Sequence, residues 1–184
     1  MHQTLPALEK AAAKVSIQES SIVALDWFNG RRTPDANQGL TGAIKGLNLG
    51  SDAPRIYRAL VESTAFGAKK IVDRFISEGV PIKGVIALGG VAKKSPFVMQ
   101  IVADVFDMKI KVARSEQACA LGAAMFASVA AGVHPTIDDA QKAMGNGFEK
   151  EYIPIAENVS AYRSLYEQYG SFADYIEKET REVL

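Results

Sequence analysis

Cysteine and histidine are scarce in this sequence, and its charges cancel. The single Cys119 excludes an intramolecular disulfide framework and, with two histidines, leaves little for a zinc site, so no metal site is predicted. The 21 Lys and Arg balance 21 Asp and Glu, which gives no electrostatic reason to expect nucleic acid as a partner. No apolar run reaches the ~20 residues of a membrane span, and the N-terminus is not a secretory signal. We therefore expect a cytoplasmic protein without a membrane partner.

The remaining composition is typical of a folded domain. Hydrophobic residues make up 48% and charged residues 23%, which argues against intrinsic disorder. A chain of 184 residues can bury a sizeable core, and we expect one domain over residues 1–184. Cys119 is expected to be a small residue of that core.

Helices and short strands alternate along the chain. The longest predicted helix begins after the N-cap Asp52 and ends at Gly79, with apolar residues every three to four positions. The apolar run at residues 85–88 indicates a strand covered on both faces. Other helices are predicted over residues 5–16, 97–106, 116–131 and 157–182, strands over 22–25 and 109–112, an irregular strand within 39–49, and only an extended segment at 152–155. The order strand, helix, strand over residues 85–112 predicts two neighbouring parallel strands and an α/β fold.

Gly89 and Gly90 are the best local signal of a binding site. Glycines directly after a buried strand let a ligand approach the backbone, and the following helix start favours anions. A tight turn without a ligand explains the same pair, so both interpretations stay open. The spacing matches neither the GxGxxG nor the P-loop motif.

Several other residues have a structural and a functional interpretation. Gly122 lies inside a predicted helix, where glycine costs ~1 kcal/mol relative to alanine. It indicates either close packing of that helix or close approach of a nucleotide. Asp26 follows a predicted strand and would cap a turn, act as a base or bind a metal. Glu62 would be paired or solvated, or would contact substrate. A stripe of three tyrosines at helical spacing favours a packing face: Tyr162, Tyr166 and Tyr169.

Three segments together resemble the C-terminal domain of the FGGY carbohydrate kinases. Residues 87–104 resemble the adenosine-side motif of that family, residues 116–124 its next helix, and residues 57–66 its long helix. Residues 25–31 are similar to the ribulokinase branch. The order and spacing of the segments match over nearly the whole chain.

The resemblance implies an actin-like, ribonuclease-H-like ATPase fold: an α/β domain with a mixed sheet and helices on both faces. Kinases of this family use Mg²⁺ and move the γ-phosphoryl group of ATP to a sugar hydroxyl. For this chain, the resemblance implies that the sugar is L-ribulose or a related ketopentose. ATP and Mg²⁺ are the implied cofactors, and arabinose catabolism is the implied context. The N-terminal domain, with the sugar site and the usual catalytic Asp, is absent from this chain, so no catalytic residue is assigned and the chain alone is expected to be inactive. Whether the protein is a homodimer stays open.

The resemblance gives a nucleotide-binding role to six residues: Gly89, Gly90, Val91, Ala92, Ser95 and Gly122. The two adjacent glycines would lie against ribose and the α-phosphate, and the next three residues would border the adenosine. Gly122 would let its helix pack closely behind that edge, while Glu62 and Asp104 are structural or interdomain candidates. The alternative is a non-catalytic actin-like module that responds to a nucleotide or a sugar.

Overall fold

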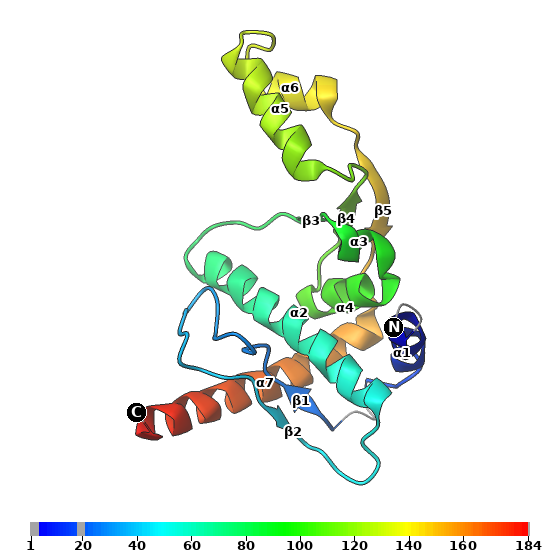
Figure 1. Ribbon diagram of the computed structural model, residues 1–184, viewed down its shortest axis with the longest axis vertical. Coiled ribbons are helices and arrows are strands. Elements are labelled where there is room, and N and C mark those ends of the chain that lie inside the picture. Colours follow the sequence, from blue (N-terminus) through cyan, green and yellow to red (C-terminus); the bar gives the residue numbers. More distant parts are fainter. Residues whose placement is uncertain (1–3, 18–20, 184) are drawn as a thin grey trace.

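The structure, a computed structural model, describes residues 4–17 and 21–183, which form helices and short strands arranged in two parts (Figure 1). The helices are α1 (Thr4–Ala12), α2 (Ala53–Ser77), α3 (Gly90–Lys94), α4 (Pro96–Phe106), α5 (Ala118–Ala130), α6 (Ile137–Met144) and α7 (Ala156–Val183). The strands are β1 (Val23–Ala24), β2 (Ile44–Lys45), β3 (Val85–Ala87), β4 (Ile110–Ala113) and β5 (Phe148–Tyr152). None of the described helices has the length and apolar character needed to cross a membrane.

The long helix α2 begins and ends where its sequence signals predict. The side chain of Asp52 accepts a hydrogen bond from the Arg55 backbone N–H at 3.0 Å, and Pro54 occupies the first turn. Gly79 follows the helix with a φ of 82°, a left-handed conformation that glycine adopts without steric cost. These local signals fix both ends of the helix before any tertiary contact is considered.

The central unit runs from β3 through α3 and α4 to β4. Val85 pairs with Ile110 in a parallel ladder, which confirms the prediction of two neighbouring strands. The expectation that β3 is covered on both faces is wrong, because Ile86 and Leu88 are 55% and 56% exposed. Only β4 pairs with β3 among the described strands, so β3 is the edge of a three-stranded mixed sheet.

The strand β5 was not predicted over its full length. Its sequence is mostly charged, and only Tyr152 is buried. Tyr152 pairs with Ile110 in an antiparallel ladder. Charged side chains are usual on an edge strand, where they discourage pairing with other chains. Because β5 therefore lacks an alternating apolar pattern, its sequence does not predict a strand.

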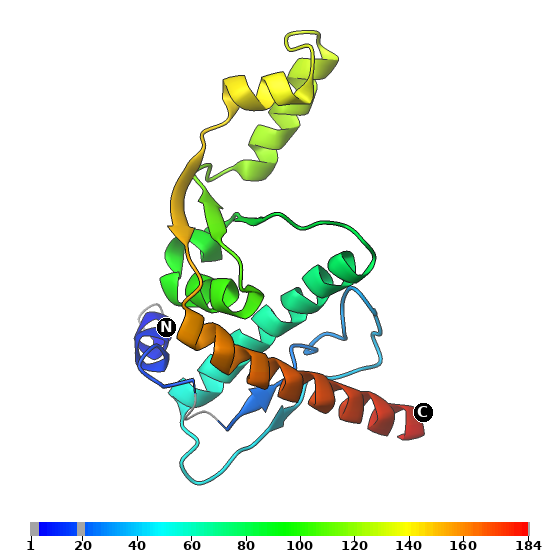
Figure 2. The same ribbon diagram turned by 180° about the vertical axis from the view of Figure 1, so that it is seen from behind.

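The main core lies where α2, α4 and α7 meet. Figures 1 and 2 show α2 and α7 crossing below the three-stranded sheet. Phe66 of α2 contacts the three tyrosines of α7, with ring centroids 5.5–6.2 Å apart. The tyrosine stripe is therefore a packing face, as predicted.

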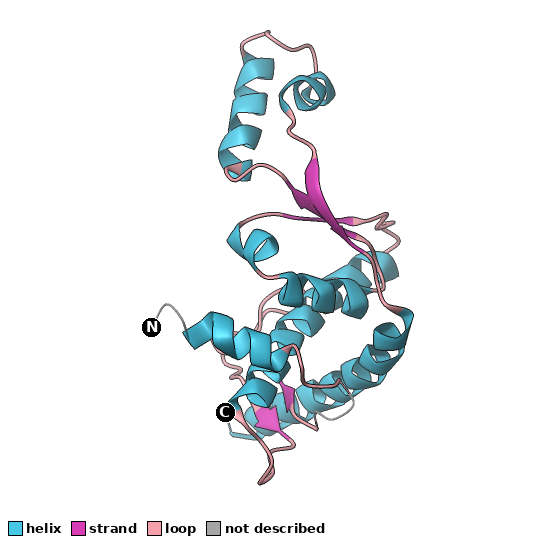
Figure 3. Cartoon of the chain, turned by 90° about the vertical axis from the view of Figure 1, so that its right-hand side faces the viewer, coloured by secondary structure: helices cyan, strands magenta, loops and turns pink. Residues whose placement is uncertain are grey.

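The helices α5 and α6 form a hairpin that projects from this body beyond β4 and β5 (Figure 3). Met125 is the only residue of α5 that is buried, and Phe126 is 68% exposed. Cys119 is exposed, so its expected place in the core is wrong. The apolar composition of α5 predicts burial, but within the described chain it packs mainly against α6.

We expect α5 to exchange its amide hydrogens at least about 100-fold faster than α2 in the isolated chain. Local opening is easiest where few side chains are buried, and α5 buries one residue whereas α2 buries six, three of them apolar. Hydrogen exchange followed by mass spectrometry measures both helices in one sample. Equal protection of the two helices would contradict the expectation.

Candidate functional site

The turn formed by Gly89 and Gly90 follows the end of β3. Gly89 has a φ of 90°, a conformation that strains any residue with a side chain, and it precedes the first turn of α3. A Cβ placed at Gly89 or at Gly90 would find no heavy atom within 4 Å. The pair therefore makes a tight turn and also leaves its backbone open on one side, so the two interpretations of the sequence are compatible.

The next predicted site residues differ in how they face the solvent. Val91 is 62% exposed, whereas Ala92 is 4% exposed and belongs to the main core. The hydroxyl of Ser95 is already engaged, because it accepts a hydrogen bond from the Val98 N–H at 3.1 Å and donates one to Glu9 at 2.9 Å. Of these side chains, Val91 is the one that can touch a ligand beside Gly90.

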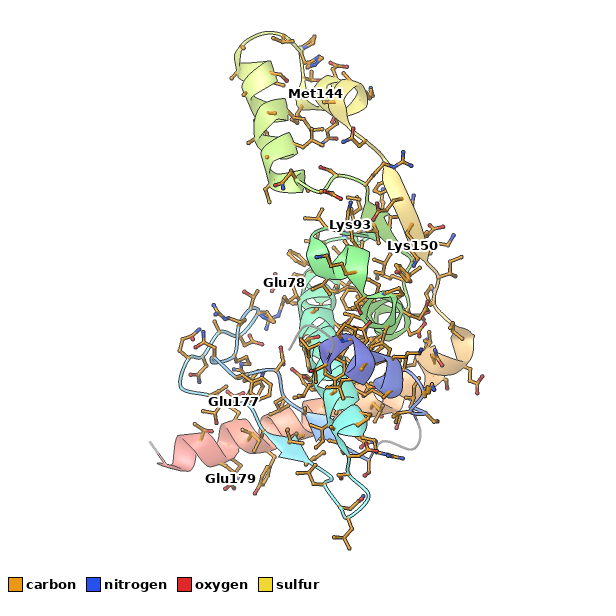
Figure 4. All side chains as sticks on the ribbon, turned by 45° about the vertical axis from the view of Figure 1, so that its right-hand side comes forward. Glu78, Lys93, Met144, Lys150, Glu177 and Glu179 are labelled. Atoms are coloured by element: carbon orange, nitrogen blue, oxygen red, sulfur yellow. The ribbon has the colours of Figure 1, made fainter. Side chains whose placement is uncertain are left out.

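Lys93 fixes α3 to the sheet rather than facing the open side of the glycine turn. Its ammonium donates a hydrogen bond to the Arg114 carbonyl at 2.7 Å and lies 3.4 Å from Glu149 of β5. Figure 4 labels Lys93 on α3, close to β5 and its labelled Lys150. These contacts hold the glycine turn in place through a side chain that the sequence did not single out.

Gly122 is not brought into contact with the glycine turn. It lies on α5, in the projecting hairpin, and a Cβ there would find nothing within 4 Å. The expected close packing of its helix is therefore not seen in the described residues.

Glu62 belongs to a buried polar network between α2 and α7. Its carboxylate accepts hydrogen bonds from Arg58 at 2.7 Å and from the Tyr162 hydroxyl at 3.0 Å. Arg58 also donates to the Tyr162 hydroxyl at 2.8 Å and to the Val15 carbonyl at 2.9 Å. Burial raises the pKa of Glu62, while Arg58 and Tyr162 act to lower that pKa. These partners give Glu62 a structural role.

Asp104 is the second buried acid, and it ties α4 to the start of α7. Its carboxylate accepts hydrogen bonds at 2.8 Å from the Ile155 N–H, from Asn158 and from Gln100. Ile155 and Asn158 lie 51 and 54 residues further along the chain, beyond the reach of a sequence pattern.

Asp26 lies just after β1 and is partly buried. Its carboxylate accepts a hydrogen bond from the Tyr169 hydroxyl at 2.7 Å. Burial raises the pKa of Asp26, and the Tyr169 hydrogen bond partly offsets that effect. Within residues 4–17 and 21–183, no group of three or more His, Cys, Asp or Glu side chains could hold a metal ion, so Asp26 does not belong to such a group.

Comparison with known proteins finds a family model that matches the segment containing the glycine turn. The model of the FGGY family of carbohydrate kinases, C-terminal domain, matches residues 2–131, a segment that includes β3, α3 and α5. The chain belongs to the FGGY family of carbohydrate kinases. Helix α6, strand β5 and helix α7 lie beyond the matched residues.

Two curated FGGY relatives share much of the sequence. The ribulokinase of Vibrio parahaemolyticus is 49% identical over 98% of this chain, and that of Bacillus licheniformis is 44% identical over 94%. The aligned part is 33% of the first relative and 32% of the second. The chain therefore spans about a third of the length of these relatives.

Solved structures of FGGY kinases share the fold. The xylulose kinase of Rhodospirillum rubrum matches 96% of this chain with a TM-score of 0.81 and 24% identity, covering 35% of its own chain. A ligand-bound xylulose kinase from Lactobacillus acidophilus matches 100% of this chain with a TM-score of 0.87 and 21% identity, covering 37% of its own chain. The chain has the actin-like ATPase fold of these kinases, with a mixed sheet as predicted.

Proposed function

We propose that residues 1–184 are the ATP-binding C-terminal domain of a cytoplasmic kinase that phosphorylates L-ribulose or a related ketopentose. The open backbone at Gly89 and Gly90, inside the segment that matches the FGGY model, is the observation that carries this proposal. Both relatives named above are ribulokinases, which favours a ketopentose as the sugar and disfavours a non-catalytic binding module. Sugar binding and catalysis are assigned to the other two thirds of the longer protein.

The residues of the glycine turn fit a nucleotide. The missing Cβ atoms at Gly89 and Gly90 leave room for ribose and the α-phosphate against the backbone. Val91 would provide an exposed apolar edge for the adenosine. Ala92 and Ser95 would stabilise the turn. Ala92 packs in the main core, and Ser95 caps the N-terminus of α4. The bound ATP would supply the phosphoryl group that the reaction transfers.

Magnesium does not fit the described residues in the same way. They contain no cluster of acidic or other ligating side chains that could hold a metal ion. We assign Mg²⁺ to the nucleotide phosphates and to the rest of the protein.

Gly90→Val in the complete enzyme is expected to raise the KM for ATP about tenfold or more and the KM for the sugar by less than about twofold. A valine side chain at position 90 would occupy the open space beside the backbone that the nucleotide needs. Gly90 has no positive φ and no neighbour within 4 Å, so the variant should fold normally. Steady-state kinetics with each substrate varied in turn, together with a thermal melt, measure these effects.

Gly84→Val is the matched control. Gly84 also has no positive φ and no neighbour within 4 Å, but it precedes β3 instead of following it. Its kinetics should match those of the unchanged enzyme. An unchanged KM for ATP in a well-folded Gly90→Val enzyme would contradict nucleotide binding at the glycine pair and leave the interpretation of a tight turn without a ligand.

A further inference from the structure

A second cavity lies far along the chain from the glycine turn. It is lined by the loop at residues 26–35, the middle of α2 and the C-terminal half of α7, and its volume is about 530 Å³. That volume is within the ~300–1,000 Å³ of small-molecule sites. None of the six residues assigned to the nucleotide lines it.

Asp26 forms a fixed polar wall of this cavity. Its Oδ1 accepts the hydrogen bond from Tyr169, and its Oδ2 accepts none from another side chain among the described residues. A Cβ at Gly67 would overlap Oδ2, so the glycine is what allows the carboxylate to lie against α2. The carboxylate is thus held at the cavity wall, with Oδ1 bonded to Tyr169 and Oδ2 lying against Gly67 of α2.

Three cations and four acids line the cavity, and Arg74 outside the lining pairs with the fourth acid, Asp35. Arg31 pairs with Glu177 at 2.6 Å, and Figure 4 labels Glu177 on α7 beside the loop that carries Arg31. Asp35 pairs with Arg74, which lies outside the lining, at 2.7 Å.

Two cations and two acids of the lining then remain: Arg32, Lys70, Asp26 and Asp174. Within the described part of the chain, neither Arg32 nor Lys70 forms an ion pair with a carboxylate, and the Lys70 ammonium lies 5.3 Å from the centroid of the Tyr166 ring. The cavity therefore offers hydrogen-bond donors and acceptors without a net charge.

We propose that this cavity binds a neutral polyhydroxylated small molecule, such as a pentose or a sugar alcohol. Carboxylates accept hydrogen bonds from hydroxyl groups, while ammonium and guanidinium groups donate to hydroxyl oxygens. A phosphate dianion would have to lie beside Asp26 and Asp174, and a dication beside Arg32 and Lys70. A neutral polyol is repelled by neither the acids nor the cations, and its hydroxyl groups can form hydrogen bonds with both. This site is independent of the nucleotide site proposed above.

Titration calorimetry of the 184-residue chain with ribitol and with D-ribose tests the proposal, and inorganic phosphate serves as the charged comparator. We expect saturable binding of at least one polyol below about 10 mM and none of phosphate. Asp26→Asn should weaken polyol binding about tenfold or more, because a hydrogen bond to a charged group is stronger than one to an amide. Lys70→Gln should weaken it about threefold.

Lys69→Gln is the matched control, because Lys69 is next in sequence but pairs with Asp73 at 3.0 Å outside the cavity lining. It should bind polyol as the unchanged chain does. Lys70 is exposed, so its variant keeps the proposal falsifiable even if Asp26→Asn fails to fold. Three results would each overturn the proposal: no saturable polyol binding, phosphate binding of equal strength, or equal losses in the Lys69 and Lys70 variants.

Discussion

Arg58→Ala is expected to lower the free energy of unfolding by about 3–5 kcal/mol, the usual cost of removing one partner of a buried ion pair. Arg58 and Glu62 are 5% and 2% exposed, and their side chains meet at 2.7 Å. Without the guanidinium, Glu62 and the carbonyls of Ala12 and Val15 lose their charged donor. Urea denaturation of the chain and of the variant measures the difference.

The pH dependence of this loss identifies its cause. Burial holds the pKa of Glu62 above its usual value of 4.5, and Arg58 opposes that shift. Removing Arg58 raises the folded-state pKa further. A carboxyl group with a raised folded-state pKa contributes stability that is present at low pH and lost as the pH rises through that pKa. The stability deficit of Arg58→Ala should therefore be larger at about pH 8 than at about pH 5.

Arg55→Ala provides the control for Arg58→Ala. Arg55 pairs with Asp52 at 2.6 Å, but both side chains are substantially exposed, at 34% and 49%. Exposed pairs contribute about 0–1 kcal/mol, so this variant should remain close to the unchanged chain in stability. A similar loss in both variants, or a deficit that does not depend on pH, would contradict the burial argument.

The elements that the sequence predicted correctly carry their signals locally. Asp52 and Ser95 each cap a helix through a backbone N–H three residues ahead, and such caps can be read without knowing the fold. The parallel pairing of β3 with β4 followed from the short distance between them along the chain. The glycine turn was found by the same kind of local reading.

The features that the sequence did not predict depend on distant partners. Glu62 meets Tyr162 across 100 residues, and the cavity beside Asp26 combines a loop with α2 and α7. The wrong predictions that β3 is covered on both faces and that Cys119 lies in the core have a different cause. The apolar surroundings of β3 and Cys119 indicate burial that the described residues do not supply, in a chain that spans about a third of its relatives.

The 184-residue chain alone is expected to show no sugar-dependent formation of ADP from MgATP, a loss of at least about 10⁴-fold relative to a complete ribulokinase. Phosphoryl transfer needs a positioned hydroxyl and a base beside it. Among the described residues, the two buried acids Glu62 and Asp104 are already held by hydrogen bonds from Tyr162 and Asn158 of α7, so neither is placed to act as that base.

A coupled assay of ADP release with L-ribulose tests this expectation, and the complete Vibrio parahaemolyticus ribulokinase serves as the positive control because it is 49% identical to this chain over the aligned residues. The corresponding segment of that enzyme, prepared alone, is the matched negative control. Any slow release of ADP should be the same with and without sugar, because hydrolysis needs no sugar hydroxyl. Sugar-dependent release that scales with the concentration of the isolated chain would show that these residues hold the catalytic base, and the division of roles proposed above would then be wrong.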